Sequence, residues 1–575
     1  MLLSVLCALT VQIAVQTSPQ SSSTPADGGA MLISGGTIIT NDDAMPRAEA
    51  VLVLRGRIAA VGTLEQVRAQ LPAQRVDHVD LKGAYLYPGF ADGHAHLVGI
   101  GSAMNRVDLM GTTSYRDVLD RVREFAAKRG ELAPGTWLRG RGWDQNDWKV
   151  KEFPTHERLS KAFPNTPVLL SRVDGHAALA NQAAMKVAGL TAASVDPPGG
   201  KIIRDDDGNP TGVFIDAAID LVSAHAPAMS DEELEHSLRL AIGALHKQGI
   251  TSIHDAGASR RQIAIFQKLS AAGELGLRVH VMVSASLSKE LDYWLERGPV
   301  MDPRGQVQVR AMKVYADGAL GSRGAAMLEE YSDEPGNFGL MLTEYDELLD
   351  LSMRGLEAGF QVCTHGIGDR GNRAILDAYQ HAFEAAAGMG GASKSASAVG
   401  KASRFRIEHA QIVAREDIPR FAAYGVLPAM QTQHQVSDMP WAEDRVGPER
   451  IKGAYAWQSM INSGSIVVNG SDAPVEMLDS VGCFVAAVSR TDANGKPKGG
   501  WYPKEAMSRA DALRSITSWS AYGAFWEDEL GSVSVGKRAD FTVLSADLLK
   551  APLEEVRKAK VIATVFDGRL VYQAN

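Results

Sequence analysis

Apolar stretches alternate with amphipathic, helix-like stretches through the middle of the chain, the pattern of parallel strands joined by helices. Eight apolar stretches predict β-strands, at residues 85–96, 250–256, 277–284, 307–315, 361–366, 404–409, 426–431 and 465–470. Eight strands in such an alternation are typical of a closed (β/α)8 TIM barrel. The sequence therefore predicts an α/β fold built on this barrel.

A long segment of about 150 residues separates the first two predicted strands. One connecting helix cannot occupy a segment of this length. We therefore predict an inserted subdomain at roughly 104–245, which contains the tryptophan-rich stretch 139–148.

Both ends of the chain carry short β-branched runs broken by glycine, at 31–40, 50–62, 531–544 and 561–572. These runs predict one small β-sandwich built from both chain ends. The predicted limits are 21–87 and 525–575 for the two parts of the sandwich and 88–524 for the barrel with its insert.

Residues 1–15 are almost wholly apolar and carry no charged side chain. The run resembles the apolar core of a secretory signal peptide and is too short to span a membrane. We predict a signal peptide at 1–20 and an exported protein, periplasmic or secreted, without a membrane anchor. A leader that does not work as a signal would leave the protein in the cytoplasm.

The composition limits the kinds of partner and of metal site that the chain can have. The net charge is −9 and no long basic run occurs, which argues against a nucleic-acid partner. There are three cysteines, and Cys7 lies in the leader, so neither a disulfide framework nor a thiolate zinc cluster can be built. Any metal must be held by histidine, lysine and carboxylate side chains.

Such side chains lie at the C-terminal ends of the predicted strands, where barrel enzymes build their active sites. His94 and His96 close the first strand, and their two-residue spacing puts both imidazoles on one face. Imidazole pairs suit Zn²⁺ and similar metals. Four further residues end or follow later strands: Lys313, His365, His409 and Asp472.

Taken singly, each of these residues has a structural explanation. His365 fits a hydrogen-bonded core histidine, Lys313 a salt-bridge partner of Asp317, and Asp472 a turn residue or helix cap. Together they make a site at the barrel mouth the better interpretation, because five strands would otherwise place such residues there by accident.

Six motifs follow one another along the chain: GFADGHAH at 89–96, KVYADGALGSR at 313–323, THGIGD at 364–369, RIEHAQ at 406–411, QHQVSDMPW at 433–441 and NGSDAP at 469–474. In type and order they resemble those of the metal-dependent amidohydrolase superfamily. The most similar branch is amidohydrolase family 3, which includes N-substituted formamide deformylases. The resemblance covers residues 31–575.

The resemblance implies roles for the residues at the strand ends. His94 and His96 would bind a first metal, and His365 and His409 a second. Lys313 would bridge two metals when carbamylated, or would contact substrate as a free amine. Asp472 would touch metal and manage the proton. The implied cofactor is one or two divalent ions, with zinc as the first candidate.

Other side chains are candidates for the substrate. His176 would hydrogen-bond the substrate carbonyl or the oxyanion as a second catalytic residue, Arg323 would meet a substrate carboxylate, and His434 would line the site. Trp143 would wall an apolar pocket. The alternatives are a loop histidine for His176, an ion pair with Asp317 or Glu329 for Arg323, and the core of the insert for Trp143.

The predicted function is hydrolysis of a C–N bond other than a peptide bond, in a small N-acyl or N-formyl amide. Metal-activated hydroxide would attack, with Asp472 moving the proton. The chain lacks the Gly-x-Ser-x-Gly and His-Glu-x-x-His motifs of serine hydrolases and zincins. Alternatives left open are ester, carbamate, cyclic-amide or dipeptide hydrolysis, and a non-catalytic binding protein. The oligomeric state is also open, with a homodimer as one alternative.

Overall fold

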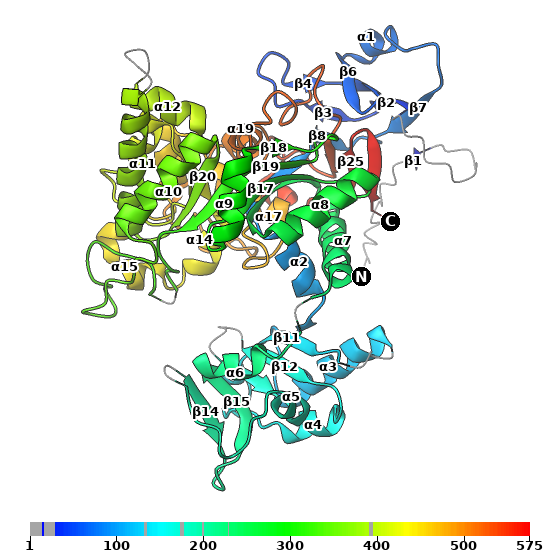
Figure 1. The fold of residues 1–575 in the computed structure, drawn as a ribbon. Helices are drawn as coiled ribbons and strands as arrows, with labels where there is room; N and C mark the ends of the chain where they lie inside the picture. The colour runs from blue at the N-terminus through cyan, green and yellow to red at the C-terminus, as the bar shows by residue number, and fades with distance from the viewer. Residues whose placement is uncertain are drawn as a thin grey trace, which may run out of the picture. The chain divides into compact units, whose positions relative to one another are not determined.

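The computed structural model describes residues 29–130, 135–172, 177–197, 200–227, 229–321, 323–389 and 395–574, with a two-residue strand β1 at Ala14–Val15. The chain divides into two compact units, one formed by Met1–Leu97 with Ile242–Asn575 and the other by Val98–Ala241. Figure 1 labels their elements. Most of the predicted signal peptide lies outside the described residues and stays a prediction.

The first unit contains eight parallel strands in one sheet. Their order is β9 (Phe90–Ala95), β16 (Ile250–Ala258), β17 (Arg278–Ser284), β19 (Val307–Tyr315), β20 (Gln361–Gly366), β21 (Arg406–His409), β22 (Leu427–Met430) and β23 (Val468–Asn469). The segment after β23 returns to β9, since Asp472 N donates to His94 O at 2.7 Å and His96 N to Ala473 O at 2.9 Å. The sheet thereby closes on itself, and the predicted TIM barrel is confirmed.

The helices that follow along the chain are α7 (Asp231–Lys247), which spans the boundary between the two units, α8 (Arg260–Ala272), α9 (Ser288–Arg297), α10 (Tyr345–Ala358), α11 (Asp369–Met389), α12 (Ala396–Ser403), α13 (Ile418–Tyr424), α14 (Thr432–Asp438), α15 (Ala442–Arg450), α16 (Trp457–Asn462) and α17 (Ser480–Ser489). Of these, α10, α11 and α12 lie side by side next to β20 in Figure 1. A short strand, β18 (Val300–Met301), pairs with β19.

Helix α8 illustrates how local sequence sets the limits of these helices. Ser259 accepts a hydrogen bond from Gln262 N, and the Gln262 side chain accepts one from Ser259 N, which satisfies two free N–H groups at the helix start. Gly273 ends the helix with φ +76°, a left-handed conformation that glycine adopts without a steric penalty.

The first predicted strand, 85–96, is wrong as a single strand. Its first part is β8 (Tyr85–Pro88), which pairs with β3 and β24 outside the barrel, and its second part is β9. The chain passes from one sheet to the other at Pro88 and Gly89. Pro88 has no N–H, and a Cβ on Gly89 would lie 2.2 Å from Thr251 Oγ1.

Two further sheets form the predicted β-sandwich. One has the order β1, β7 (Val76–Asp80), β2 (Ala30–Ser34), β5 (Ala50–Leu54) and β6 (Arg57–Gly62). The other draws on both chain ends, in the order β26 (Arg569–Gln573), β25 (Val561–Phe566), β24 (Phe541–Leu544), β8, β3 (Thr37–Ile39) and β4 (Arg47–Ala48). Apolar side chains from both sheets form one core, among them Ile33, Val51, Leu86, Phe541 and Val565. Helices α1 (Leu64–Arg68), α18 (Arg509–Ser515), α19 (Ser518–Gly523) and α20 (Leu553–Val556) complete this unit.

The second unit has its own sheet, in the order β10 (Val107–Asp108), β11 (Leu138–Trp143), β12 (Val168–Arg172), β13 (Ala177–Ala180), β15 (Pro210–Asp216) and β14 (Gly200–Arg204). Its helices are α3 (Tyr115–Arg129), α4 (Glu157–Ala162), α5 (Gln182–Val187) and α6 (Asp220–Ser223), and α2 (Leu97–Met104) begins at its N-terminal limit. Trp143 and Trp148 belong to its hydrophobic core.

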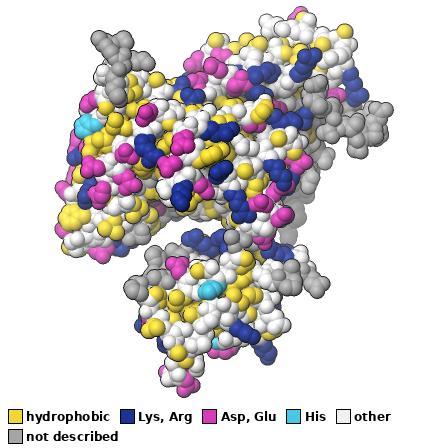
Figure 2. Space-filling model, in the orientation of Figure 1, with side chains coloured by type: hydrophobic (Ala, Val, Ile, Leu, Met, Phe, Trp, Pro, Cys, Tyr) yellow, Lys and Arg dark blue, Asp and Glu magenta, His cyan; other side chains and the backbone are white. Residues whose placement is uncertain are grey.

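The surface shows no single dominant charge on the face drawn in Figure 2, where basic and acidic side chains are interspersed over the first unit. This agrees with the modest net charge of −9. Among the described residues, no helix is both long enough and apolar enough to cross a membrane.

A buried ion pair connects the barrel to the sandwich. Arg278, on β17, is 1% exposed, and its Nε and Nη2 atoms donate to Asp540 Oδ2 and Oδ1 at 2.8 and 3.0 Å. We expect Asp540→Asn to lower the free energy of unfolding by about 3 kcal/mol, because one partner of a buried ion pair is lost. Thermal unfolding followed by fluorescence measures this as a lower Tm, and a Tm equal to that of the wild type would contradict it.

Candidate metal centre

Three of the predicted ligands meet where the first and last barrel strands adjoin. His94 Nε2 lies 3.6 Å and His96 Nε2 3.2 Å from Asp472 Oδ1. His94 is 1% exposed, whereas His96 is half-buried at the edge of the site. Two imidazoles and one carboxylate therefore converge at a single point.

The other three predicted ligands complete the cluster from the opposite side. Lys313 Nζ lies 3.4 Å from His94 Nε2. The His409 ring centroid lies 4.4 Å from that of His365 and 5.0 Å from that of His94. The structure thus brings together all six residues that the sequence predicted as metal ligands.

Asp472 is held in an unusual way. Its φ is +57°, which is uncommon for a residue with a side chain, and His409 has φ +74°. Such backbone conformations persist where the surrounding structure enforces them, often at functional sites. His434 Nε2 contacts Asp472 Oδ2 at 3.2 Å, whereas no residue in the described part of the chain donates a hydrogen bond to the buried Asp472 Oδ1.

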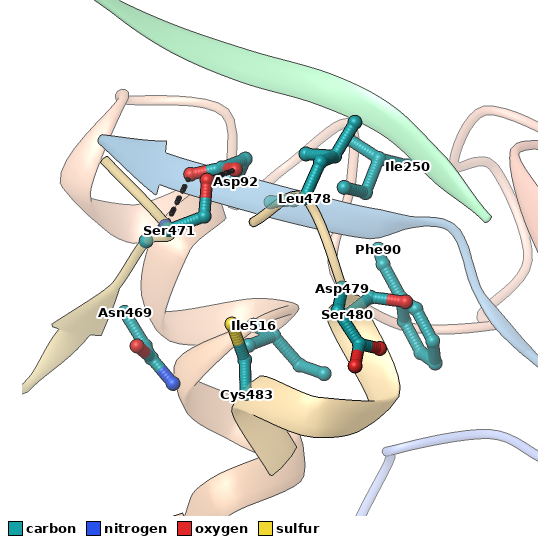
Figure 3. A pocket seen from close by; sticks show the side chains of 12 residues that line it. Phe90, Asp92, Ile250, Asn469, Ser471, Leu478, Asp479, Ser480, Cys483 and Ile516 are labelled. Carbon is teal, nitrogen blue, oxygen red and sulfur yellow. Dashed lines mark hydrogen bonds between the residues drawn. The ribbon is translucent and has the colours of Figure 1, made fainter. Parts of the chain in front are cut away.

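A carboxylate beneath this cluster fixes the turn that carries Asp472. Asp92 Oδ1 accepts hydrogen bonds from His94 N at 3.2 Å and Ser471 N at 2.9 Å, and its Oδ2 accepts one from Ser471 Oγ at 2.5 Å. Figure 3 shows Asp92 and Ser471 so joined beside a small cavity that Asn469 and Cys483 also line. Asp92 therefore orients both the loop after β23 and the backbone of His94.

Burial sets the protonation of the imidazoles and the amine. It lowers the pKa of His94 to about 4 and that of His365 to about 3, in both cases with Lys313 acting in the same direction. Burial also lowers the pKa of His409 and of Lys313. The imidazoles of His94, His365 and His409 are therefore neutral at pH 7, the form in which histidine binds metal.

The Asp472 carboxylate keeps its negative charge. Burial acts to raise the pKa of Asp472, but the hydrogen bond from His434 and the neighbouring His96 imidazole hold it well below its usual range. For His434, burial acts to lower the pKa, but Asp472 and Glu476 raise it to about 10. Asp472 is therefore an anion next to a cationic imidazolium.

The donor set fits a divalent metal. The ligand atoms of His94, His96 and Asp472 lie within 4.8 Å of one another, and so do those of His409, His434 and Asp472. The imidazoles of His94 and His96 with the Asp472 carboxylate are a ligand set for zinc and similar ions, whereas His434 would first have to give up its proton. A cation between them would also satisfy Asp472 Oδ1.

Two residues near the centre differ from the sequence analysis. His434, predicted to line the substrate site, bonds directly to Asp472. Glu408, to which the sequence analysis gave no role, is 0% exposed and contacts His94 Nδ1. Burial acts to raise the pKa of Glu408, but Arg406 and His94 lower it to about 2. The sequence signal that could have pointed to Glu408 is its position one residue before the predicted ligand His409.

The alternative salt bridge of Lys313 with Asp317 is not what the structure shows. Asp317 instead accepts hydrogen bonds from the backbone of Ala326, Ile367 and Gly368, at 2.8 to 3.0 Å. It thereby organises the loops that follow β19 and β20.

The remaining substrate candidates have other partners or lie outside the described residues. Arg323 forms an ion pair with Asp333 at 2.9 Å, instead of the alternative pairs with Asp317 or Glu329. Trp143 is 1% exposed in the core of the insert, and its Nε1 donates to Leu170 O at 2.8 Å. Their contacts with substrate stay predictions. His176 lies outside the described residues.

Cys363 lies two residues before His365 but is 0% exposed, packed with Ala256, Met282 and Ala311. Burial raises the pKa of its thiol, so it is not a nucleophile at neutral pH. We expect Cys363→Ala to leave kcat/KM unchanged and to cost about 1 kcal/mol of stability through the small cavity it creates. Steady-state kinetics test this, and a large fall in kcat at an unchanged fold would contradict it.

Comparison with known proteins identifies the family to which this barrel belongs. The family model described as "Amidohydrolase family" matches residues 77–572. The chain belongs to the amidohydrolase family. This amidohydrolase is accordingly a hydrolase, and the predicted family is confirmed. Amidohydrolases usually bind divalent metal, which agrees with the donor set described above.

Relatives of this amidohydrolase match over nearly their whole length. LONG AFTER FAR-RED 3 of Arabidopsis thaliana is 32% identical over 554 residues, which cover 94% of this chain and 91% of its own. N-substituted formamide deformylase of Arthrobacter pascens is 28% identical over 566 residues, covering 94% and 98%. The crystal structure of an uncharacterised metal-dependent hydrolase from Pyrococcus horikoshii has a TM-score of 0.75 at 25% identity, covering 92% of this chain and 99% of that chain.

Proposed function

We propose that this amidohydrolase cleaves the C–N bond of a small, non-peptide N-acyl or N-formyl amide, using divalent metal held at the barrel mouth. The observation that carries the proposal is the buried Asp472 carboxylate, whose Oδ1 has no hydrogen-bond partner among the described residues and lies 3.2 Å from His96 Nε2 and 3.6 Å from His94 Nε2.

The residues that would hold the metal surround that oxygen. His94, His96 and Asp472 would hold one ion, and His365 and His409 would face a second, with Lys313 between them. Burial lowers the pKa of the Lys313 amine, and the uncharged amine is the form that carbamylation requires. When bound, such an ion polarises the substrate carbonyl and lowers the pKa of its bound water towards neutrality.

Asp472 is placed to move the proton. Its Oδ2 is held by His434, so Oδ1 faces the site, where it would contact the metal and take up the proton of the attacking water. The same oxygen would then give the proton to the departing amine nitrogen. His434, bound to both Asp472 and Glu476, keeps the carboxylate oriented through both steps.

The choice of an N-acyl or N-formyl amide is supported by the relative from Arthrobacter pascens. That protein is named for its action on N-substituted formamides, and it matches this chain over 98% of its own length. The family motifs do not fix the substituent on nitrogen, because substrate choice depends on the loops around the site.

A matched substrate panel tests the proposed reaction. Zinc- and manganese-loaded protein is given N-alkyl and N-aryl formamides and acetamides, the corresponding formate and acetate esters, and dipeptides. We expect release of free amine from the formamides or acetamides at a higher kcat/KM than from dipeptides. Hydrolysis confined to the esters or to the dipeptides would contradict the proposal.

A further inference from the structure

We propose that Glu408, held in place by Arg406, is a positioning residue for the metal centre, because its carboxylate fixes which nitrogen of His94 faces the other ligands. This inference rests on the proposed role of His94 as a metal ligand. It concerns an ion pair inside the barrel, beneath the site.

Arg406 and Glu408 lie two residues apart on β21, so their side chains point to the same face, into the barrel. Both are 0% exposed. Arg406 Nε donates to Glu408 Oε1 at 2.7 Å, and Arg406 Nη2 donates to Glu408 Oε2 at 2.8 Å. This two-point contact holds the carboxylate rigidly and favours its ionised form.

The same carboxylate reaches His94. Glu408 Oε2 and His94 Nδ1 are within hydrogen-bonding distance. An ionised carboxylate only accepts hydrogen bonds, so Nδ1 must carry the proton. The lone pair of the neutral ring is then on Nε2, the atom that lies 3.4 Å from Lys313 Nζ and 3.6 Å from Asp472 Oδ1.

Arg406 also holds the backbone that leads into His94. Its Nη2 donates to Gly93 O at 2.7 Å, and its Nη1 contacts His254 Nδ1 at 2.7 Å. The guanidinium therefore connects the strand of Glu408 with the strand of His94. A buried ion pair often stabilises a fold less than well-packed apolar side chains in the same place would. The position of the Arg406–Glu408 pair next to His94 is therefore better explained by its orienting that ligand.

Metal affinity tests the proposal in a variant of nearly equal size. Glu408→Gln removes the charge, and its amide can present N–H to His94, which allows the other tautomer. We expect the affinity for Co²⁺ and Zn²⁺, measured by competition with a chelator, to fall about 10- to 100-fold. The visible absorption of the Co²⁺ form should also change, because the His94 ring is no longer fixed.

The matched control is Asp540→Asn, which also breaks a buried arginine–carboxylate pair but lies on the side of the barrel that faces the sandwich. It should lower the Tm and leave the metal affinity at the wild-type value. Equal affinities in Glu408→Gln, Asp540→Asn and the wild type would overturn the proposal. A wild type that binds no metal would instead overturn the proposed function.

A measurement on the metal-free wild type keeps the proposal testable if Glu408→Gln does not fold. Nitrogen-15 NMR of histidine-labelled protein reports the tautomer, and the His94 signals are assigned by their loss in His94→Gln. We expect a neutral ring protonated on Nδ1. A ring protonated on Nε2 would overturn the proposal, whatever metal the protein binds.

Discussion

Asp472→Asn is expected to reduce kcat for amide hydrolysis by about 10³-fold, within the range for loss of a positioned general base. His434 engages Asp472 Oδ2, whereas Oδ1 faces the candidate metal site, so this buried carboxylate is the proposed proton acceptor. Asparagine has almost the same shape but cannot take up the proton. Steady-state kinetics on metal-saturated protein measure the loss.

The control for this variant is Asp479→Asn, in the same loop. Asp479 is exposed, and its Oδ1 accepts a hydrogen bond from Gly482 N at the start of α17. Asparagine caps a helix about as well as aspartate, so this variant should keep kcat. If both variants lost activity equally, or if Asp472→Asn kept wild-type kcat, Asp472 would not be the proton carrier.

Removal of metal is expected to abolish hydrolysis, and addition of Zn²⁺ or Mn²⁺ should restore it. The imidazoles of His94, His365 and His409 are neutral because burial lowers their pKa, so without an added cation they do little to activate water. The experiment is dialysis against a strong chelator, followed by rate measurements before and after each metal is returned. Full activity in protein shown to be metal-free would contradict the mechanism.

The sequence was enough to predict the barrel and the six candidate metal ligands, because each of them depends on local sequence. An apolar stretch of strand length ending in a histidine, lysine or aspartate places that residue at the barrel mouth wherever the strands close. Lys313 lies 219 residues after His94, and His409 lies 96 residues after Lys313. Each of them can nevertheless be found from the end of its own strand. The closure then brings them together.

What depends on contacts between distant segments could not be predicted in this way. The contact of Glu408 with His94 joins positions 314 residues apart, and no local pattern specifies it. The division of 85–96 into two strands follows from the pairing of β8 with β24, more than 450 residues later. Arg323 was placed by its motif, but its partner Asp333 is set by the path of the loop after β19.

The side chains at the barrel mouth are proposed to hold divalent metal. The most direct test is the metal content per chain, measured by mass spectrometry on protein purified without chelator, for the wild type, Lys313→Ala and Asp540→Asn. We expect about one to two ions per chain in the wild type and Asp540→Asn, with a sharp fall in Lys313→Ala if this lysine bridges two ions. A folded wild-type protein that holds no metal, even after incubation with Zn²⁺ and Mn²⁺, would contradict it.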